Sequence, residues 1–166
     1  KMNGMDACPE DYRAFLGSDA LRDPRVILID RIMDDRDIKE LVRLCDGFLS
    51  LHRAEGFGRG LAEAMYFGKP VIATGYSGNL DFMNEANSCL VDCTLIPVGT
   101  DEYPYGAGQR WAEPDVDQAA WYLRRLVADS TYAADIGQRA AHYIRTYHSF
   151  DAIGARHRRR LEHLGL

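Results

Sequence analysis

The chain has no long apolar segment, since none of its apolar runs approaches the roughly 18 residues that a membrane-crossing helix needs. It has only four cysteines, Cys8, Cys45, Cys89 and Cys93, and they lack the close spacing of a zinc site. A cytoplasmic, reducing compartment is therefore expected. The opening residues are polar and contain no apolar core of a signal peptide. Because the chain begins with Lys1, we expect it to be a piece of a longer protein.

An excess of positive charge is also missing. The formal net charge is −5, which argues against a nucleic-acid partner for the chain as a whole. The exception is local: the last 16 residues contain Arg156, Arg158, Arg159 and Arg160. A solvated helix face is the ordinary interpretation of such a run, and peripheral contact with an anionic membrane surface is the alternative.

What the chain does contain is an alternation of short apolar runs and helical patterns. Strands are predicted at 26–29, 48–50, 71–73 and 89–91, and helices at 9–16, 34–45, 115–128, 130–147 and 151–164. Residues 2–3 are interpreted as the end of a further strand, and residues 92–114 as a long surface loop rich in proline, glycine and tyrosine. The fold class predicted is α/β: a single domain over 1–166 with a Rossmann-like parallel sheet, helices on both faces and further helices at the C-terminal end.

Residues 55–74 carry most of the functional information. Glu55 and Glu63 bracket seven residues that include the turn Gly56-Phe57-Gly58, and an amphipathic helical pattern follows. A glycine turn at a helix N-terminus presents backbone N–H groups to a phosphate, and two carboxylates can accept hydrogen bonds from sugar and ribose hydroxyls. Gly68 marks the expected helix end. This order predicts a nucleotide-sugar site at the C-terminal edge of the sheet.

The run from Ser50 to Phe82 resembles the donor-binding half of family-4 glycosyltransferases, which have the GT-B fold. The resemblance rests on Ser-Leu-His-Arg-Ala-Glu-Gly-Phe-Gly at 50–58, Glu-Ala-Met at 63–65, Gly-Lys-Pro-Val-Ile-Ala-Thr at 68–74, and Ser-Gly-Asn with Asp-Phe at 77–82. These pieces occur in the family's order, and it is their order rather than the bare pair of glutamates that makes the signal specific.

The resemblance implies a role for each matching position. Glu55 is the catalytic candidate, because a carboxylate can stabilise positive charge that develops at the anomeric carbon. Glu63 is expected to bind the ribose hydroxyls. The other donor-binding candidates are Gly56, Phe57 and Gly58 for the diphosphate, Leu61 for ribose or base (a core role is the alternative), Ile32 for the nucleobase, and His52 and Asn79. Arg53 is interpreted either as a phosphate ligand or as a solvated side chain.

The resemblance also implies the reaction. The expected parent is a bacterial, cytoplasmic hexosyltransferase that transfers a sugar, with retention, from a nucleotide-diphosphate sugar to a glycan or lipid-linked acceptor, at or near the inner face of the membrane. No cofactor or metal is expected, and no Asp-x-Asp pair lies near the site. The acceptor-binding N-terminal domain is not recognised here, so this fragment alone is expected to be inactive. A different GT-B enzyme, such as an epimerase or phosphorylase, and a non-catalytic nucleotide-sugar-binding module are the alternatives.

Overall fold

A computed structural model describes residues 9–100 and 102–166 of the chain. The strand predicted at residues 2–3 and Cys8 lie outside the described residues. The chain divides into two compact units, Lys1–Ile38 and Lys39–Leu166, so the boundary falls inside a helix, α3 (Asp35–Leu44). The single-domain assignment remains a prediction, and the two units are described separately below.

The first unit contains α1 (Pro9–Leu16), α2 (Asp19–Arg22) and the start of α3. The strand predicted at residues 26–29 is wrong, because this segment is irregular and Ile27 is 81% exposed. Asp23 instead forms a local turn in which its carboxylate accepts hydrogen bonds from the Arg25 backbone and guanidinium. An apolar run becomes a strand only beside another strand, and none pairs with it among the described residues. Asp34 caps α3, accepting from the Asp37 backbone N–H at 2.7 Å.

The second unit is built on a three-stranded parallel sheet of β1 (Phe48–Ser50), β2 (Val71–Thr74) and β3 (Cys89–Val91), in the order β1-β2-β3. Phe48 pairs with Val71, and Ile72 pairs with Cys89. The three predicted strands of this unit and their parallel direction are confirmed.

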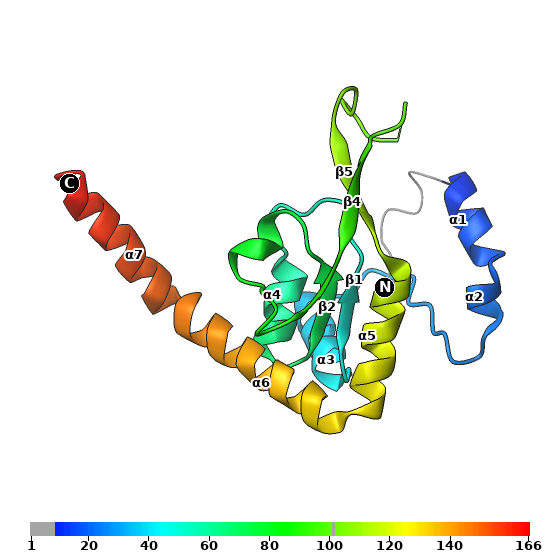
Figure 1. The fold of residues 1–166 in the computed structure, drawn as a ribbon, viewed down its shortest axis with the longest axis horizontal. Helices are drawn as coiled ribbons and strands as arrows, with labels where there is room; N and C mark the ends of the chain where they lie inside the picture. The colour runs from blue at the N-terminus through cyan, green and yellow to red at the C-terminus, as the bar shows by residue number, and fades with distance from the viewer. Residues whose placement is uncertain (1–8, 101) are drawn as a thin grey trace. The chain divides into compact units, whose positions relative to one another are not determined.

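Helices cover both faces of this sheet, as predicted (Figure 1). Val71 and Ala73 of β2 share one core cluster with residues of α3, α4 and α6, whereas Ile72 points to the other face and packs in a cluster with residues of α5 and α6. The helical elements are α4 (Arg59–Tyr66), η2 (Gly78–Asp81), α5 (Val116–Ala128), α6 (Ser130–Tyr147) and α7 (Phe150–His163). Among the helices of the described residues, none is long and apolar enough to cross a membrane.

The segment predicted as a loop at 92–114 forms an antiparallel pair of strands at its two ends, so that prediction is wrong for residues 93–97 and 110–114. Its strands are β4 (Cys93–Pro97) and β5 (Arg110–Pro114), with Cys93 opposite Pro114 and Pro97 opposite Arg110. Only the connection between the two strands is irregular. Pro97 and Pro114 sit at strand ends, where a missing N–H costs no central ladder bond, and Pro104 lies in the connection, so the prolines did not exclude strands here.

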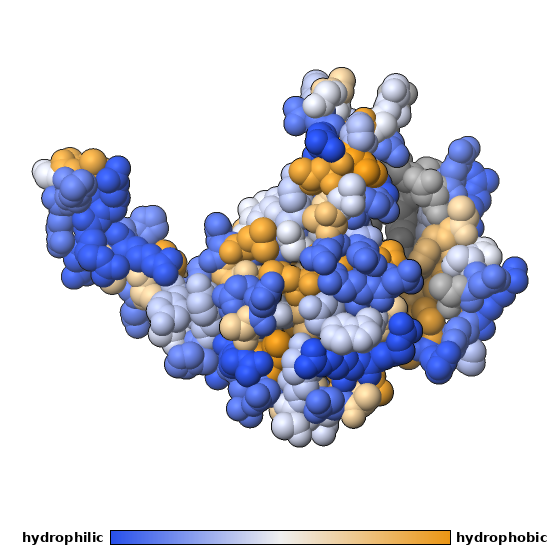
Figure 2. Space-filling model, in the orientation of Figure 1, coloured by the Kyte–Doolittle hydropathy of each residue, from blue (hydrophilic) through white to orange (hydrophobic). Residues whose placement is uncertain are grey.

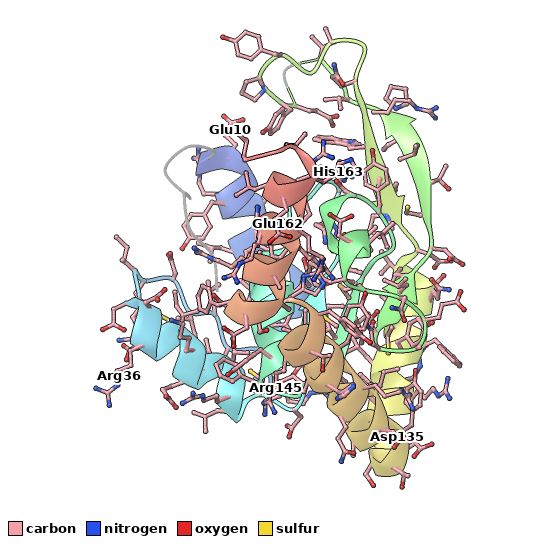
Figure 3. All side chains as sticks on the ribbon, turned by 90° about the vertical axis from the view of Figure 1, so that its left-hand side faces the viewer. Glu10, Arg36, Asp135, Arg145, Glu162 and His163 are labelled. Carbon is pink, nitrogen blue, oxygen red and sulfur yellow. The ribbon has the colours of Figure 1, made fainter. Side chains whose placement is uncertain are left out.

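Helix α4 ends where the sequence predicted. Gly68 is left-handed (φ +74°), and hydrogen bonds from Gly68 N to Met65 O and from Lys69 N to Ala64 O form a Schellman motif. Arg145, labelled in Figure 3, reaches from α6 to this end of α4 and donates from Nη2 to the Tyr66 carbonyl at 2.7 Å. Helix α6 lies so close to the turn that a Cβ on Gly137 would be 2.2 Å from the Gly68 carbonyl oxygen.

We expect Gly137→Ala to lower the free energy of unfolding by about 1–3 kcal/mol, because the added methyl group meets rigid backbone. Gly154→Ala is the matched control: it is also in a helix, but its Cβ would meet nothing within 4 Å. That control should leave stability unchanged or raise it by up to about 1 kcal/mol. Urea unfolding measures both, and equal midpoints for the two variants would contradict the close contact.

Candidate functional site

Two loops meet at the C-terminal edge of the sheet. The first follows β1 and contains Glu55, and the second follows β2 and contains Ser77 and Gly78. The Glu55 carbonyl oxygen accepts hydrogen bonds from Ser77 Oγ at 2.8 Å and from the Gly78 backbone N–H at 3.0 Å. Because β1 and β2 are parallel neighbours, their carboxyl ends bring both loops to one edge, where open α/β sheets bind ligands.

The contact between these loops depends on glycine. A Cβ on Gly78 would lie 2.0 Å from the Gly56 carbonyl oxygen, so no side chain fits at position 78 without displacing the first loop. Ser77, directly before it, has φ +80°, which is unusual for a non-glycine residue. Its hydroxyl bond to the Glu55 carbonyl helps to hold this conformation.

The glycine turn leads into α4 as predicted. Gly58 is the N-cap with φ +92°, and no side chain caps the helix. Its carbonyl accepts the first intrahelical hydrogen bond from Ala62 N at 2.9 Å. The N–H groups of the first turn therefore have no partner within the helix, and they carry the positive end of the helix dipole. Gly56 and Phe57 are exposed beside this end, so the geometry suits an anion such as a diphosphate.

The two glutamates differ in their surroundings. The carboxylate of Glu55 has no hydrogen-bond or ion-pair partner among residues 9–100 and 102–166, although its backbone is held firmly. The Glu63 side chain is about one-third exposed (34%) and has Arg59 at 3.9 Å, a loose contact across one helical turn. Both carboxylates are thus available to hydroxyl groups of a ligand.

His52 and Asn79 are bound within the protein itself. His52 Nε2 lies 3.1 Å from the Tyr76 carbonyl and 3.2 Å from Asn79 Oδ1, while its Nδ1 lies 3.3 Å from Ser50 Oγ. Since the Tyr76 carbonyl only accepts, we assign the proton to Nε2. Asn79, fully buried, donates from Nδ2 to the Thr74 carbonyl at 3.0 Å. Both side chains tie the two loops together, and their contact with a donor remains a prediction.

Arg53 has a role that the sequence did not reveal. Its Nη2 pairs with Glu113 Oε2 at 2.5 Å, and its guanidinium lies 4.8 Å from the centre of the Trp111 ring. Its carbonyl accepts from Ala112 N at 2.8 Å. All three partners belong to β5, so the hairpin is fastened to the loop two residues before Glu55. Arg53 is thus engaged by protein groups while its side chain stays 42% exposed, and this engagement disfavours the phosphate-ligand interpretation. The sequence around Arg53 gives no sign of these contacts, because all three partners lie in β5, far along the chain.

The remaining predicted residues fall in different environments. Leu61 is 2% exposed and belongs to the core beneath the glycine turn, the alternative that the sequence left open. Phe57 is 47% exposed, and its ring centre lies 5.0 Å from that of Phe82. Phe82 also contacts His148 at 5.9 Å, and partial burial, together with the charge of Arg156, lowers the pKa of His148. Ile32 belongs to the first unit and is 96% exposed, so its role stays a prediction.

Two other features do not contribute to this site. A hollow of about 620 Å³ lies at the opposite edge of the sheet. Its lining includes Phe48, which begins β1, Pro70, which directly precedes β2, and Leu126 of α5. It does not include the glycine turn. Among the described residues, no three His, Cys, Asp or Glu side chains gather as metal ligands. That the reaction needs no metal stays a prediction.

The described fold is a mixed α/β domain of the Rossmann-like class. Comparison with family models matches residues 19–143 to glycosyl transferases group 1, so the chain belongs to this family and contains a glycosyltransferase domain. The match includes both loops of the site and all of the parallel sheet. A comparison with curated proteins finds no match.

We expect Gly78→Ala to destabilise the protein by about 1–3 kcal/mol, because the methyl group forces the two loops apart. Gly56→Ala is the control from the other side of the same contact, since a Cβ at position 56 meets nothing within 4 Å. Urea unfolding should show a loss for the first variant and little change for the second. A stable Gly78→Ala protein would show that the loops are not packed as described.

Proposed function

We propose that this domain binds the donor of a retaining glycosyltransferase and that the donor is a nucleotide-diphosphate sugar. The reaction transfers the sugar, a hexose by resemblance, to a glycan or lipid-linked acceptor held by another domain of the enzyme. The setting proposed is bacterial polysaccharide or glycolipid synthesis in the cytoplasm. No cofactor and no metal take part in the proposal.

One observation carries the proposal: the Glu55 backbone is fixed by Ser77 and Gly78 while its carboxylate has no partner among the described residues. A carboxylate held in place but left unpaired is suited to act on something other than the protein. The uncapped N-terminus of α4, three residues further on, supplies a place for the diphosphate at the same edge.

In this proposal, each element of the site contacts a different part of the donor. The N–H groups at the start of α4 would take the diphosphate, and Glu63 in that helix would accept hydrogen bonds from the ribose hydroxyls. Glu55 would face the transferred sugar, where its negative charge stabilises an oxocarbenium-like transition state more than it stabilises the neutral donor. His52, Asn79 and Arg53 hold the loops together, and donor contact by His52 and Asn79 stays a prediction.

A non-catalytic nucleotide-sugar-binding module is the main alternative. It needs the diphosphate and ribose contacts but makes no use of a fixed, unpaired Glu55. An epimerase or phosphorylase of the same overall fold is disfavoured by the Glu55–Glu63 pattern. Binding experiments test the part that these alternatives share, and turnover experiments separate them.

The chain should be stabilised against heat by at least one member of a panel of nucleoside diphosphates and their sugar conjugates. Glu63→Gln should weaken the best ligand about fivefold, since the amide keeps an acceptor oxygen and a hydrogen bond to a charged acceptor is worth about 1 kcal/mol more than one to a neutral acceptor. Calorimetric titration gives the dissociation constants. Glu85→Gln is the control, because Glu85 is exposed in the loop after η2. No stabilisation by any nucleotide would overturn the proposed donor site.

In the active enzyme, Glu55→Gln should reduce turnover more than donor affinity. The amide keeps the shape of the side chain but loses the charge that the transition state needs. Steady-state kinetics measures turnover, a separate binding titration measures donor affinity, and the two losses are then compared. Unchanged turnover with much weaker donor binding would assign Glu55 to binding alone and would favour the module without catalysis.

A further inference from the structure

The stretch from Glu55 to Glu63 also contains one basic residue. Arg59 is the first residue of α4 and directly follows Gly58, the N-cap of that helix. Its side chain is 86% exposed, and its one interaction among residues 9–100 and 102–166 is a loose contact from Nε to Glu63 Oε1 at 3.9 Å. In the orientation of Figure 2, charged and polar side chains cover much of the second unit, so exposure alone does not mark Arg59 as functional.

The position of Arg59 at the start of a helix is more informative. The N–H groups of the first turn carry about half an elementary positive charge, so a cation beside them is destabilising, whereas an acidic side chain there is stabilising. The first turn of α4 contains no acidic residue, and no side chain caps it. An anion bound between these N–H groups and the guanidinium would therefore improve the local charge balance.

A nucleoside diphosphate needs more positive charge than this backbone provides. Glu55 and Glu63, the carboxylates proposed to contact the donor, add two negative charges to the same site. Half a charge at the helix end does not offset both the carboxylates and the phosphates. Residues 50–63 contain two arginines, Arg53 and Arg59, and the first is held against β5 by Glu113. Arg59 is the one left to contact a ligand.

We propose that Arg59 binds the diphosphate of the donor and is a specificity-determining residue, favouring nucleoside diphosphates over nucleosides. This inference rests on the proposed function, since it names a further contact of the same donor. The N–H groups of α4 bind one side of the diphosphate, and the guanidinium, which offers two parallel N–H donors, binds another.

The contact between Arg59 and Glu63 changes when the donor binds. An exposed ion pair contributes little, and at 3.9 Å this one is weakly held, so Arg59 can leave it at small cost. The Glu63 carboxylate then becomes free for the ribose hydroxyls. One movement of the arginine thus serves both the diphosphate and the ribose.

Calorimetric titration of the 166-residue chain with a phosphate series tests this role. The series consists of uridine, guanosine, adenosine and thymidine with their monophosphates and diphosphates. Arg59→Gln should weaken the best-bound diphosphate about fivefold, the upper range for an exposed charge contact, and leave the matching nucleoside nearly unchanged. Arg59→Lys should lose less, because it keeps the charge without the paired donors. High salt should reduce the difference between Arg59→Gln and the unchanged chain.

Arg124→Gln is the matched control, because it removes the same charge elsewhere. Arg124 is exposed on α5, which packs against the other face of the sheet from α4. This variant should leave every affinity unchanged. Urea unfolding should show that Arg59→Gln is as stable as the unchanged chain or slightly more stable, since the cation at the helix end is gone.

The outcomes separate this inference from the donor site itself. If the unchanged chain binds a diphosphate and Arg59→Gln binds it equally well, or loses no more affinity than Arg124→Gln, the role of Arg59 is overturned while the donor site stands. Equal losses for nucleoside and diphosphate would show a structural effect and overturn it too. So would tighter nucleoside binding with unchanged diphosphate binding, which would assign Arg59 to Glu63 alone. If the unchanged chain binds no nucleotide, the donor site fails and this inference fails with it.

Discussion

The site depends on a single backbone oxygen. The Glu55 carbonyl receives two hydrogen bonds from the loop after β2, and those bonds join the ends of two parallel strands at one edge of the sheet. Their formation requires the close approach that glycine at position 78 permits. With the main chain of Glu55 satisfied in this way, its side chain is not needed to hold the loop. Because the backbone alone holds this loop, the carboxylate can stay unpaired in an ordered segment.

The same loop is supported from outside the sheet. The hairpin β4–β5 contacts Arg53 through a backbone hydrogen bond, an ion pair and a ring face, so the chain is fixed just before Glu55 as well as at it. Gly58 then fixes the chain again by starting α4. Between these anchors, only a short stretch around the exposed Gly56 and Phe57 has a backbone that is free to meet a ligand. Because the ion pair is half-exposed, it contributes little to overall stability, and its importance lies in where it holds the loop.

The features that the sequence predicted correctly are those that interactions between neighbouring residues determine. The glycine turn, the end of α4 at Gly68 and the three paired strands follow from conformational preference and periodicity. The failures involve long-range partners. Residues 26–29 are apolar enough for a strand but lack a neighbouring strand among the described residues, and the hairpin's prolines concealed strands that pair with each other. The engagement of Arg53 by β5, like that of His52 by Tyr76, joins segments far apart in the chain, which no spacing rule reveals.

A series of ring contacts connects the loop after β1 to the start of α7. Phe57 contacts Phe82, Phe82 contacts His148, and His148 caps the end of α6, directly before α7 begins. Spatial contact alone does not establish that one end responds to the other. What the contacts do supply is placement: Phe82 is 1% exposed and packed in the core, so Phe57 and the start of α7 rest on the same rigid support. The start of α7 therefore lies at a defined position relative to the glycine turn. A fixed geometry of this kind suits a transferase, because donor and acceptor must be brought together in one arrangement for transfer to occur.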